Sequence, residues 1–493
     1  MPTAGADGGC RRIRLPAPSP HPAERHRARI RAIGEPAGAT RRLSVATTTS
    51  LLPDSHDPEV AASPTGASGG PADAAPHLAA ASPPRAGLIL FALWLMVFTA
   101  ASQTILITPI LPIIGEELGM GPGPLGWLVS LYSWVLAAAA VVMGPVSDRI
   151  GRRRVLLLGS GWLAAALALH GLADSYGMLL AARVLAGAGG GMLSGAAVSY
   201  VGDAFPYARR GWATGWVMSG VPFGLVLGVP MGRMLAVASG YKLPFLVFAG
   251  VMAAAFVLIL TVVPQPDIER SETLTLRGAL RQYGALLRLR DAQVASLLYF
   301  LMYLSLGLLL FYLPYWLTEQ FPDLTVRVFG EPLVLLGLPV DFIASLFLVG
   351  GVASVLVSPR AGALSDTIGR KPLILASCVG LVVVSVAMTY VVRERWSAYA
   401  VYLAIMTLFA MRMSPLQALM TAIVPERVRG SFLSMAIAVG QVGTGIGATL
   451  AGALYEGAGY RAATFASGAV VLAMTVLVWL ALPEPEGDAV EAA

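Results

Sequence analysis

The sequence has little charge and almost no cysteine. Of its 493 residues, 13 % are charged and 56 % hydrophobic, and the mean hydropathy is +0.71. This balance excludes a soluble globular protein and predicts a protein of the lipid bilayer. The two cysteines are Cys10, in a polar tail, and Cys378, inside an apolar run. A disulfide framework and cysteine redox chemistry are therefore not expected.

Motifs of common enzyme chemistry are also missing. The sequence contains no phosphate-cradling loop, metal-ligand cluster or nucleophile arrangement, and the glycine run 189–191 lies inside an apolar segment rather than after a strand. We therefore expect neither an enzyme nor a cofactor or metal. The net charge is +6, but the basic residues lie in the first 42 positions and in short loops, which indicates membrane topology rather than nucleic-acid binding.

Twelve apolar runs follow the polar tail, each near or above the roughly 20 residues that a spanning helix needs. Because backbone amides in hydrocarbon must bond internally, runs of this length predict helices. Their limits are 88–112, 124–146, 154–173, 177–201, 213–236, 243–264, 293–317, 340–358, 372–391, 397–423, 431–454 and 462–482.

A short polar motif occurs at matching places in the two halves of the chain. The stretch from Gly144 to Arg152 reads GPVSDRIGR, and the stretch from Gly362 to Arg370, which begins 218 residues later, reads GALSDTIGR. The pairs at 240–241 and 459–460, both Gly-Tyr, are 219 residues apart. These matches predict a duplicated six-helix unit, with an insertion near 328–339 that is a candidate lid.

The duplication divides the chain into five segments. We predict a disordered cytoplasmic tail at 1–86, six-helix halves at 87–264 and 293–482, a cytoplasmic linker at 265–292 and a short cytoplasmic tail at 483–493. Sixteen lysines and arginines lie in the loops on the side of the first tail, and five lie on the other side. This positive-inside pattern predicts that both termini are cytoplasmic.

The repeated motif resembles the signature loop of the major facilitator superfamily, which connects helices 2 and 3 and again helices 8 and 9. The resemblance covers residues 87–482 and implies an all-α membrane fold of twelve transmembrane helices in two six-helix repeats. In the family the loop carboxylate is thought to pair across the halves with the start of helix 11 and close an inner gate. The implied gating residues are Gly144, Asp148, Arg149, Gly151 and Arg152 in the first copy, and Gly362, Asp366, Gly369 and Arg370 in the second, where Thr367 replaces the usual basic residue.

Glycines recur every four residues in the predicted helix 5, at Gly224, Gly228 and Gly232, and Gly443 and Gly447 repeat the spacing in helix 11. Small residues at this spacing let two helix backbones approach closely. The stretch in helix 5 also resembles the antiporter motif of drug and sugar exporters, although Pro230 lies one place later than in the family pattern. It therefore favours efflux, and close helix packing explains it equally well.

The sequence suggests a substrate site from two arginines inside spans. Arg412 lies near the bilayer midplane of helix 10, where a charge is costly unless it faces water, a partner or a ligand. Arg183 resembles the helix 4 arginine of exporters, with Ala186 in place of the usual glutamine. Snorkelling of Arg183 and a structural bond of Arg412 to helix-end carbonyls are the alternatives. The predicted substrate contacts are Arg412, Arg183, Gln103, Tyr299, Tyr303 and Tyr402.

We interpret the chain as a secondary active transporter of a bacterial inner membrane, a proton-coupled efflux permease for drug- or sugar-like small molecules. No acidic residue lies well inside a span, so the proton coupling rests on the resemblance rather than on the residues. Uptake or facilitated transport of a small organic anion, and a non-transporting membrane sensor, are the alternatives. The expected partners are a small-molecule substrate, protons and the lipid bilayer, and the expected oligomeric state is a monomer.

Overall fold

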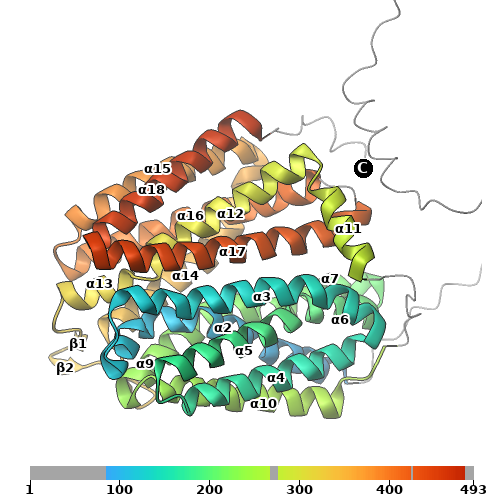
Figure 1. Cartoon of the computed structure of the whole chain (residues 1–493), viewed down its shortest axis with the longest axis horizontal. Helices are drawn as coiled ribbons and strands as arrows, with labels where there is room; N and C mark the ends of the chain where they lie inside the picture. The colour runs from blue at the N-terminus through green and yellow to red at the C-terminus, as the bar shows by residue number, and fades with distance from the viewer. Residues whose placement is uncertain (1–84, 267–275, 424–425, 483–493) are drawn as a thin grey trace, which may run out of the picture. The chain divides into compact units, whose positions relative to one another are not determined.

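The computed structural model describes residues 85–266, 276–423 and 426–482, all within one compact unit. Nearly all of the predicted N-terminal tail and the whole C-terminal tail lie outside these residues. Twelve helical segments are long and apolar enough to cross a membrane, and each coincides with one predicted span. The predicted all-α membrane fold is therefore confirmed (Figure 1).

The N-terminal half contains six spans, two of them built from several helices. They are α2 (Ala86–Leu118), α3 (Pro122–Ile150), α4 (Arg152–Gly171), α5 (Tyr176–Leu193) with α6 (Ala196–Ala204), α7 (Tyr207–Met218) with α8 (Gly220–Phe223), η1 (Gly224–Gly228) and α9 (Val229–Ser239), and α10 (Lys242–Val262).

The C-terminal half repeats this order after a short connecting helix. Its elements are α11 (Leu276–Leu286), α12 (Arg290–Leu310) with α13 (Leu313–Gln320), α14 (Phe342–Ile368), α15 (Arg370–Val391), α16 (Arg395–Ile423), α17 (Glu426–Ala458) and α18 (Tyr460–Ala481).

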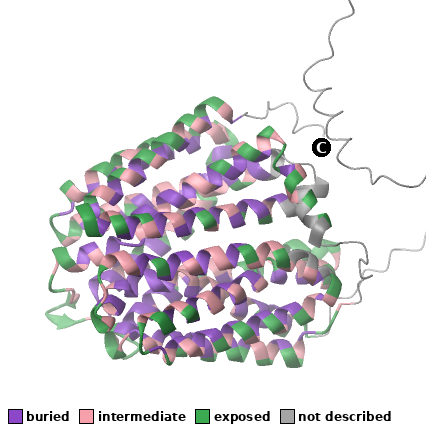
Figure 2. Cartoon of the chain, viewed as in Figure 1, coloured by how far each residue is buried: buried purple, intermediate pink, exposed green. Residues whose placement is uncertain are grey.

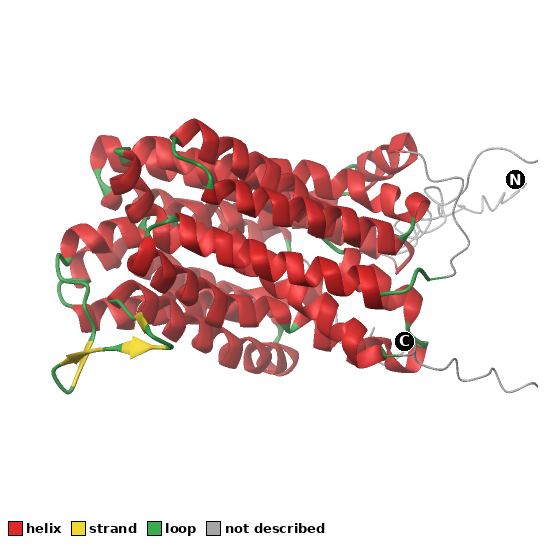
Figure 3. Cartoon of the chain, turned by 90° about the horizontal axis from the view of Figure 1, so that it is seen from below, coloured by secondary structure: helices red, strands yellow, loops and turns green. Residues whose placement is uncertain are grey.

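Four very short strands form the insertion between α13 and α14. Strands β1 (Arg327–Val328) and β2 (Glu331–Pro332) pair antiparallel, as do β3 (Val334–Leu335) and β4 (Leu338–Pro339). This double hairpin lies at one end of the helix bundle (Figure 3). We call this end the hairpin side, and the opposite end, where α2 begins at Ala86, the tail side.

Equivalent turns in the two halves have the same backbone geometry. Gly151 has φ 96° and ψ 144°, and Gly369 has φ 94° and ψ 148°. A side chain would be strained at such positive φ values, which explains why glycine occupies both positions. Two residues after each of these glycines, a basic side chain donates a hydrogen bond to a backbone carbonyl. Arg153 donates to the Leu260 carbonyl at 2.7 Å, and Lys371 donates to the Trp479 carbonyl at 3.0 Å. Each basic residue thereby satisfies carbonyls at the end of the last helix of its half.

Helix 5 is not a regular α-helix. The segment η1 is a π-helical turn that ends two residues before Pro230, which has no N–H to donate to a carbonyl one turn earlier. A π-helical turn absorbs this break without ending the span, and such turns are frequent at functional sites.

The outer surface of the bundle is apolar, as lipid contact requires. Leu158, Trp479 and Leu480 are exposed to 58, 66 and 68 %, and other large hydrophobic side chains point outward along the helices. Buried residues concentrate on the inner helix faces (Figure 2). Between the halves, α3 packs on α17, and η1 and α9 pack on α14.

Candidate functional site

A cavity of about 570 Å³ lies between the two halves, a volume within the usual range for small-molecule sites. Its walls come from α2, α8 and η1 of the first half and from α12, α14 and α16 of the second. The lining residues are Ile105, Thr108, Val221, Pro222, Leu225, Leu306, Leu310, Phe311, Phe347, Gly351, Ser354, Val355, Ser358, Pro359, Tyr402, Met406, Phe409, Ala410, Met413, Ser414 and Gln417.

Among the described residues that line this cavity, none has a charged side chain. Its polar groups are hydroxyls and the Gln417 amide, and Tyr299 hydrogen-bonds with Gln417 from behind the wall. Phe347 and Tyr402 stand with ring centroids 5.4 Å apart. Aromatic and methionine side chains with a few hydroxyls suit a hydrophobic molecule that offers one or two hydrogen-bonding groups.

The cavity extends toward the tail side and ends at the hairpin side. Ser358 and Pro359 lie at the end of the middle third of α14, and Gln417 lies in the last third of α16, and both helices run toward the tail side. At the hairpin side, α3 and α17 hold the halves together. Ser130 donates to the Gly445 carbonyl at 2.5 Å, and Tyr312 to the Pro122 carbonyl at 2.5 Å.

Arg412 does not reach the cavity, although Phe409 and Met413 beside it do. Its side chain is fully buried inside the C-terminal half, where it donates to the Met474 sulfur at 3.9 Å and contacts the Cys378 thiol. The guanidinium also lies 5.2 Å from the centre of the Phe409 ring. Arg412 therefore supports the cavity wall from behind in this conformation.

The predicted tyrosines are divided between the cavity and the layer behind it. Tyr402 lines the cavity, whereas Tyr299 and Tyr303, with ring centroids 6.0 Å apart, lie behind its wall. Of the six predicted substrate contacts, Tyr402 is thus the one that the structure places at the cavity surface.

Arg183 and Gln103 belong to a second buried polar cluster, inside the N-terminal half. The Arg183 guanidinium lies 4.2 Å from the centre of the Tyr132 ring, and its Nε donates to the Leu128 carbonyl at 3.0 Å. Gln103 donates to the Tyr132 hydroxyl at 2.6 Å, and Thr104 contacts the same hydroxyl at 2.8 Å. The cluster joins α2, α3 and α5, and the structure gives Arg183 this internal role rather than a snorkelled position.

The predicted inner gate is described only in part, because the structure gives the backbone but not the side chains of Asp148 and of the first residues of α17, and gives no surroundings for Gly144. Arg149 is exposed in the last turn of α3, and Arg152 forms an ion pair with Asp203 at 2.7 Å. In the second copy, Asp366 lies 3.8 Å from Arg370 in its own loop. The gating role of both loops stays a prediction.

The helix 5 glycines lie against α2. A Cβ on Gly224 would come within 3.0 Å of Ser102, and one on Gly232 would overlap the Leu106 side chain. The helix 11 glycines lie against α12 in the same way, since a Cβ on Gly443 would lie 2.5 Å from the Phe300 carbonyl oxygen, and one on Gly447 2.5 Å from that of Leu304. Both rows allow close packing within one half.

Sequence reasoning missed a third arginine inside a span, Arg233 of α9. It forms a buried ion pair with Asp341 at the start of α14. Arg233 lies in the predicted span 213–236, so its charge was visible in the sequence. Its partner Asp341 is 108 residues away, so the sequence did not indicate the ion pair. Among the described residues, no cluster of three or more metal-binding side chains occurs.

A family model of the Major Facilitator Superfamily matches residues 93–321 and 295–493 of this chain. Multidrug resistance protein MdtG of Proteus mirabilis is 25 % identical over 407 residues, covering 80 % of this chain and 96 % of its own. The uncharacterized MFS-type transporter YceJ of Bacillus subtilis is 24 % identical over 392 residues, covering 78 % of this chain and 95 % of its own.

Two solved structures share the fold. The D-xylose-proton symporter superposes with a TM-score of 0.66 at 17 % identity, covering 81 % of this chain and 99 % of its own. The human organic anion transporter MFSD10 (TETRAN) superposes with a TM-score of 0.58 at 19 % identity, covering 80 % of this chain and 100 % of its own. With the family model matching nearly all of the helical bundle, this chain belongs to the Major Facilitator Superfamily and is a multi-pass membrane transporter.

Proposed function

We propose that this transporter exports small, uncharged, lipophilic molecules by alternating access, with protons as the coupling ion. The observation that carries the substrate class is the cavity between the halves, whose described lining residues are apolar and aromatic and include none with a charged side chain. A charged substrate that entered this cavity would lose its hydration without gaining a counter-charge. The multidrug resistance proteins at about 25 % identity support the export direction.

The position of the cavity supports alternating access. Its walls come from both halves, so a rocking motion of one half against the other would move it from one side of the membrane to the other. We assign the tail side to the cytoplasm, because the loops there carry most of the lysines and arginines. The state described here is then closed to the outside and positioned to receive substrate from the cytoplasm or the inner leaflet.

The organic-anion alternative depends on Arg183 and Arg412. Both guanidinium groups lie inside their own halves and outside the cavity lining, so the described lining residues offer an anion no cationic partner. A sensor without transport activity is the remaining alternative, and saturable transport distinguishes it.

Transport in inside-out vesicles tests the proposal. The probes are an uncharged lipophilic dye, a lipophilic cation and an organic carboxylate, each measured with and without a pH gradient. We expect saturable, gradient-dependent uptake of the uncharged dye and no saturable uptake of the carboxylate. Saturable carboxylate transport without proton movement would instead support the anion alternative.

The variant Ser354→Asp sharpens this test, because it places one carboxylate on the cavity wall. It should move the preference from the uncharged dye toward the cation. Vesicles without the protein provide the background.

A further inference from the structure

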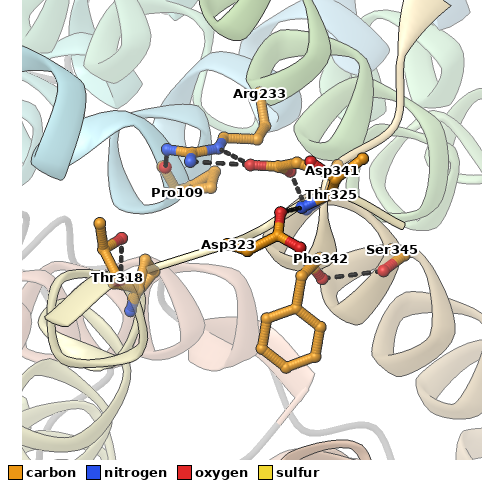
Figure 4. A network of polar contacts seen from close by, with 10 residues as sticks. Pro109, Arg233, Thr318, Asp323, Thr325, Asp341, Phe342 and Ser345 are labelled. Carbon is orange, nitrogen blue, oxygen red and sulfur yellow. Dashed lines mark hydrogen bonds and ion pairs between the residues drawn. The ribbon is translucent and has the colours of Figure 1, made fainter. Parts of the chain in front are cut away.

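Arg233 and Asp341 link the two halves at the hairpin side (Figure 4). Nε and Nη2 of Arg233 each lie 2.8 Å from Oδ2 of Asp341. Nη1 of Arg233 donates to the Pro109 carbonyl at 2.6 Å. Arg233 and Pro109 belong to the N-terminal half and Asp341 to the C-terminal half, so each of these bonds to Asp341 crosses the boundary between the halves.

This ion pair is shielded from solvent. Arg233 is 3 % and Asp341 7 % exposed, and among the described acidic residues Asp341 is the one that is buried. Met234 of α9 packs beside it against Val340 and Ala344 of the other half. The apolar contact excludes water from the pair and thereby strengthens the attraction between its charges.

Asp341 is held firmly in place. Its Oδ1 accepts the Ala344 N–H at 2.8 Å and so caps α14, while its backbone pairs with Thr325 across the base of the insertion. Arg395 of α16 fastens that base through the backbone carbonyls of Thr325 and Asp323. Hydrogen bonds from Thr325, together with the Arg395 guanidinium, lower the pKa of Asp323. The Asp323 carboxylate beside Arg395 therefore stays charged at neutral pH.

The pair also adjoins the cavity. Thr108 lines the cavity, and the next residue, Pro109, is the one whose carbonyl binds Arg233. Opening the cavity toward the hairpin side requires α9 to separate from α14, which must break the contact between Arg233 and Asp341.

We propose that Arg233 and Asp341 form a hairpin-side gate, closed in the state described here and broken when the cavity opens to that side. This inference rests on the proposed alternating access. An ion pair suits such a gate, because the attraction gained in the closed state is largely balanced by the hydration that both charges regain on opening. The ion pair can therefore stabilise the closed state without making the free energy of opening prohibitive.

Distance measurements between spin labels on the two halves test the gate. The labels are placed at Ser239→Cys, at the end of α9, and Glu394→Cys, before α16, in a Cys10→Ser and Cys378→Ala background. Both label sites are exposed. Asp341→Asn removes the charge but retains an oxygen for the α14 cap, and Arg233→Gln leaves Asp341 intact. In each variant we expect the ratio of the long-distance to the short-distance population to rise about tenfold or more.

Asp174→Asn is the matched control. It breaks the ion pair with Lys242, which lies on the same side of the membrane but within one half. Its distance distribution should equal that of the labelled parent protein. Thermal unfolding in detergent shows whether each variant is folded. If one of the two gate variants fails to fold, the distance distribution of the other still tests the gate.

An unchanged distribution in a folded gate variant would overturn the proposal. Dye transport by the unsubstituted protein is measured separately, so the two hypotheses can fail independently. If the protein transports the dye and Asp341→Asn alters neither distances nor transport, only the gate is wrong. If the protein shows no saturable transport, the proposed function fails, whatever the distances show.

Discussion

Gly351 of α14 lies directly against Val226 of η1, across the boundary between the halves. A Cβ on Gly351 would lie 3.1 Å from the Val226 Cα and 3.2 Å from the Leu225 carbonyl oxygen. These neighbours are backbone atoms and cannot rotate away. Gly351 and Leu225 also line the cavity, so the π-helical turn of helix 5 and the glycine of helix 8 determine how closely the halves meet at the proposed substrate site.

Gly351→Val should therefore impair transport without preventing membrane insertion. Overpacking at a tight contact typically costs about 1–3 kcal/mol, and we expect the initial rate of dye transport to fall about tenfold or more. Gly250→Val is the control, since a Cβ at Gly250 on α10 meets no atom within 4 Å. Equal losses in both variants would show that the valine acts through helix propensity rather than through crowding.

Phe409→Ala and Arg412→Met should separate the cavity surface from the layer behind it. Phe409 lines the cavity, so loss of its ring should raise the Kd of a lipophilic dye about tenfold or more. Arg412 does not line the cavity and has no carboxylate partner among the described residues. Methionine retains most of its apolar volume, so Arg412→Met should change the Kd less than about threefold. Equilibrium dye binding to purified protein measures both values. A larger effect at Arg412 than at Phe409 would restore Arg412 as a direct substrate contact.

The fold could be predicted because its signals are local. Each span is an apolar run in the sequence, and the turns at Gly151 and Gly369 repeat both their residues and their backbone angles. Lipid forces every backbone group in a span to bond within its own helix, so length and hydropathy suffice to locate the helices. The geometry of the insertion could not be predicted in this way, because its strands are only two residues long.

The substrate site was predicted less well, because its lining depends on which face of each helix is turned toward the cavity. Tyr402 and Arg412 lie ten residues apart on α16, about 2.8 turns, which places their side chains about 80° apart around the helix. The cavity-lining residues Ala410, Ser414 and Gln417 lie on the other side of Tyr402, so Arg412 falls outside the lining face. The face of Tyr402 continues through Met406, Phe409 and Met413, which apolar composition alone does not distinguish from core. Arg233 was visible as a charge in a span, but only tertiary structure brings it to Asp341.

Tyr132→Phe tests the polar cluster of the N-terminal half. The Tyr132 hydroxyl accepts a hydrogen bond from Gln103 and contacts the Thr104 hydroxyl, and all three belong to α2 and α3. Buried side-chain hydrogen bonds in membrane proteins contribute modestly, so the variant should lower the free energy of unfolding by about 1 kcal/mol. Denaturant titration in mixed micelles measures this change. Because the cluster lies away from the cavity lining, dye affinity should stay constant, and a parallel loss of affinity would link the cluster to substrate binding.

Gly447→Ala tests the packing of helix 11 on helix 7. A Cβ at this position would lie 2.5 Å from the Leu304 carbonyl oxygen and 3.0 Å from the Gly307 Cα, so the two backbones would have to move apart. We expect a loss of about 1–3 kcal/mol in the free energy of unfolding. Gly457→Ala on the same helix is the matched control, because its Cβ meets no atom within 4 Å and alanine favours the helix. If Gly447→Ala is as stable as Gly457→Ala, the glycine row is not needed for close packing.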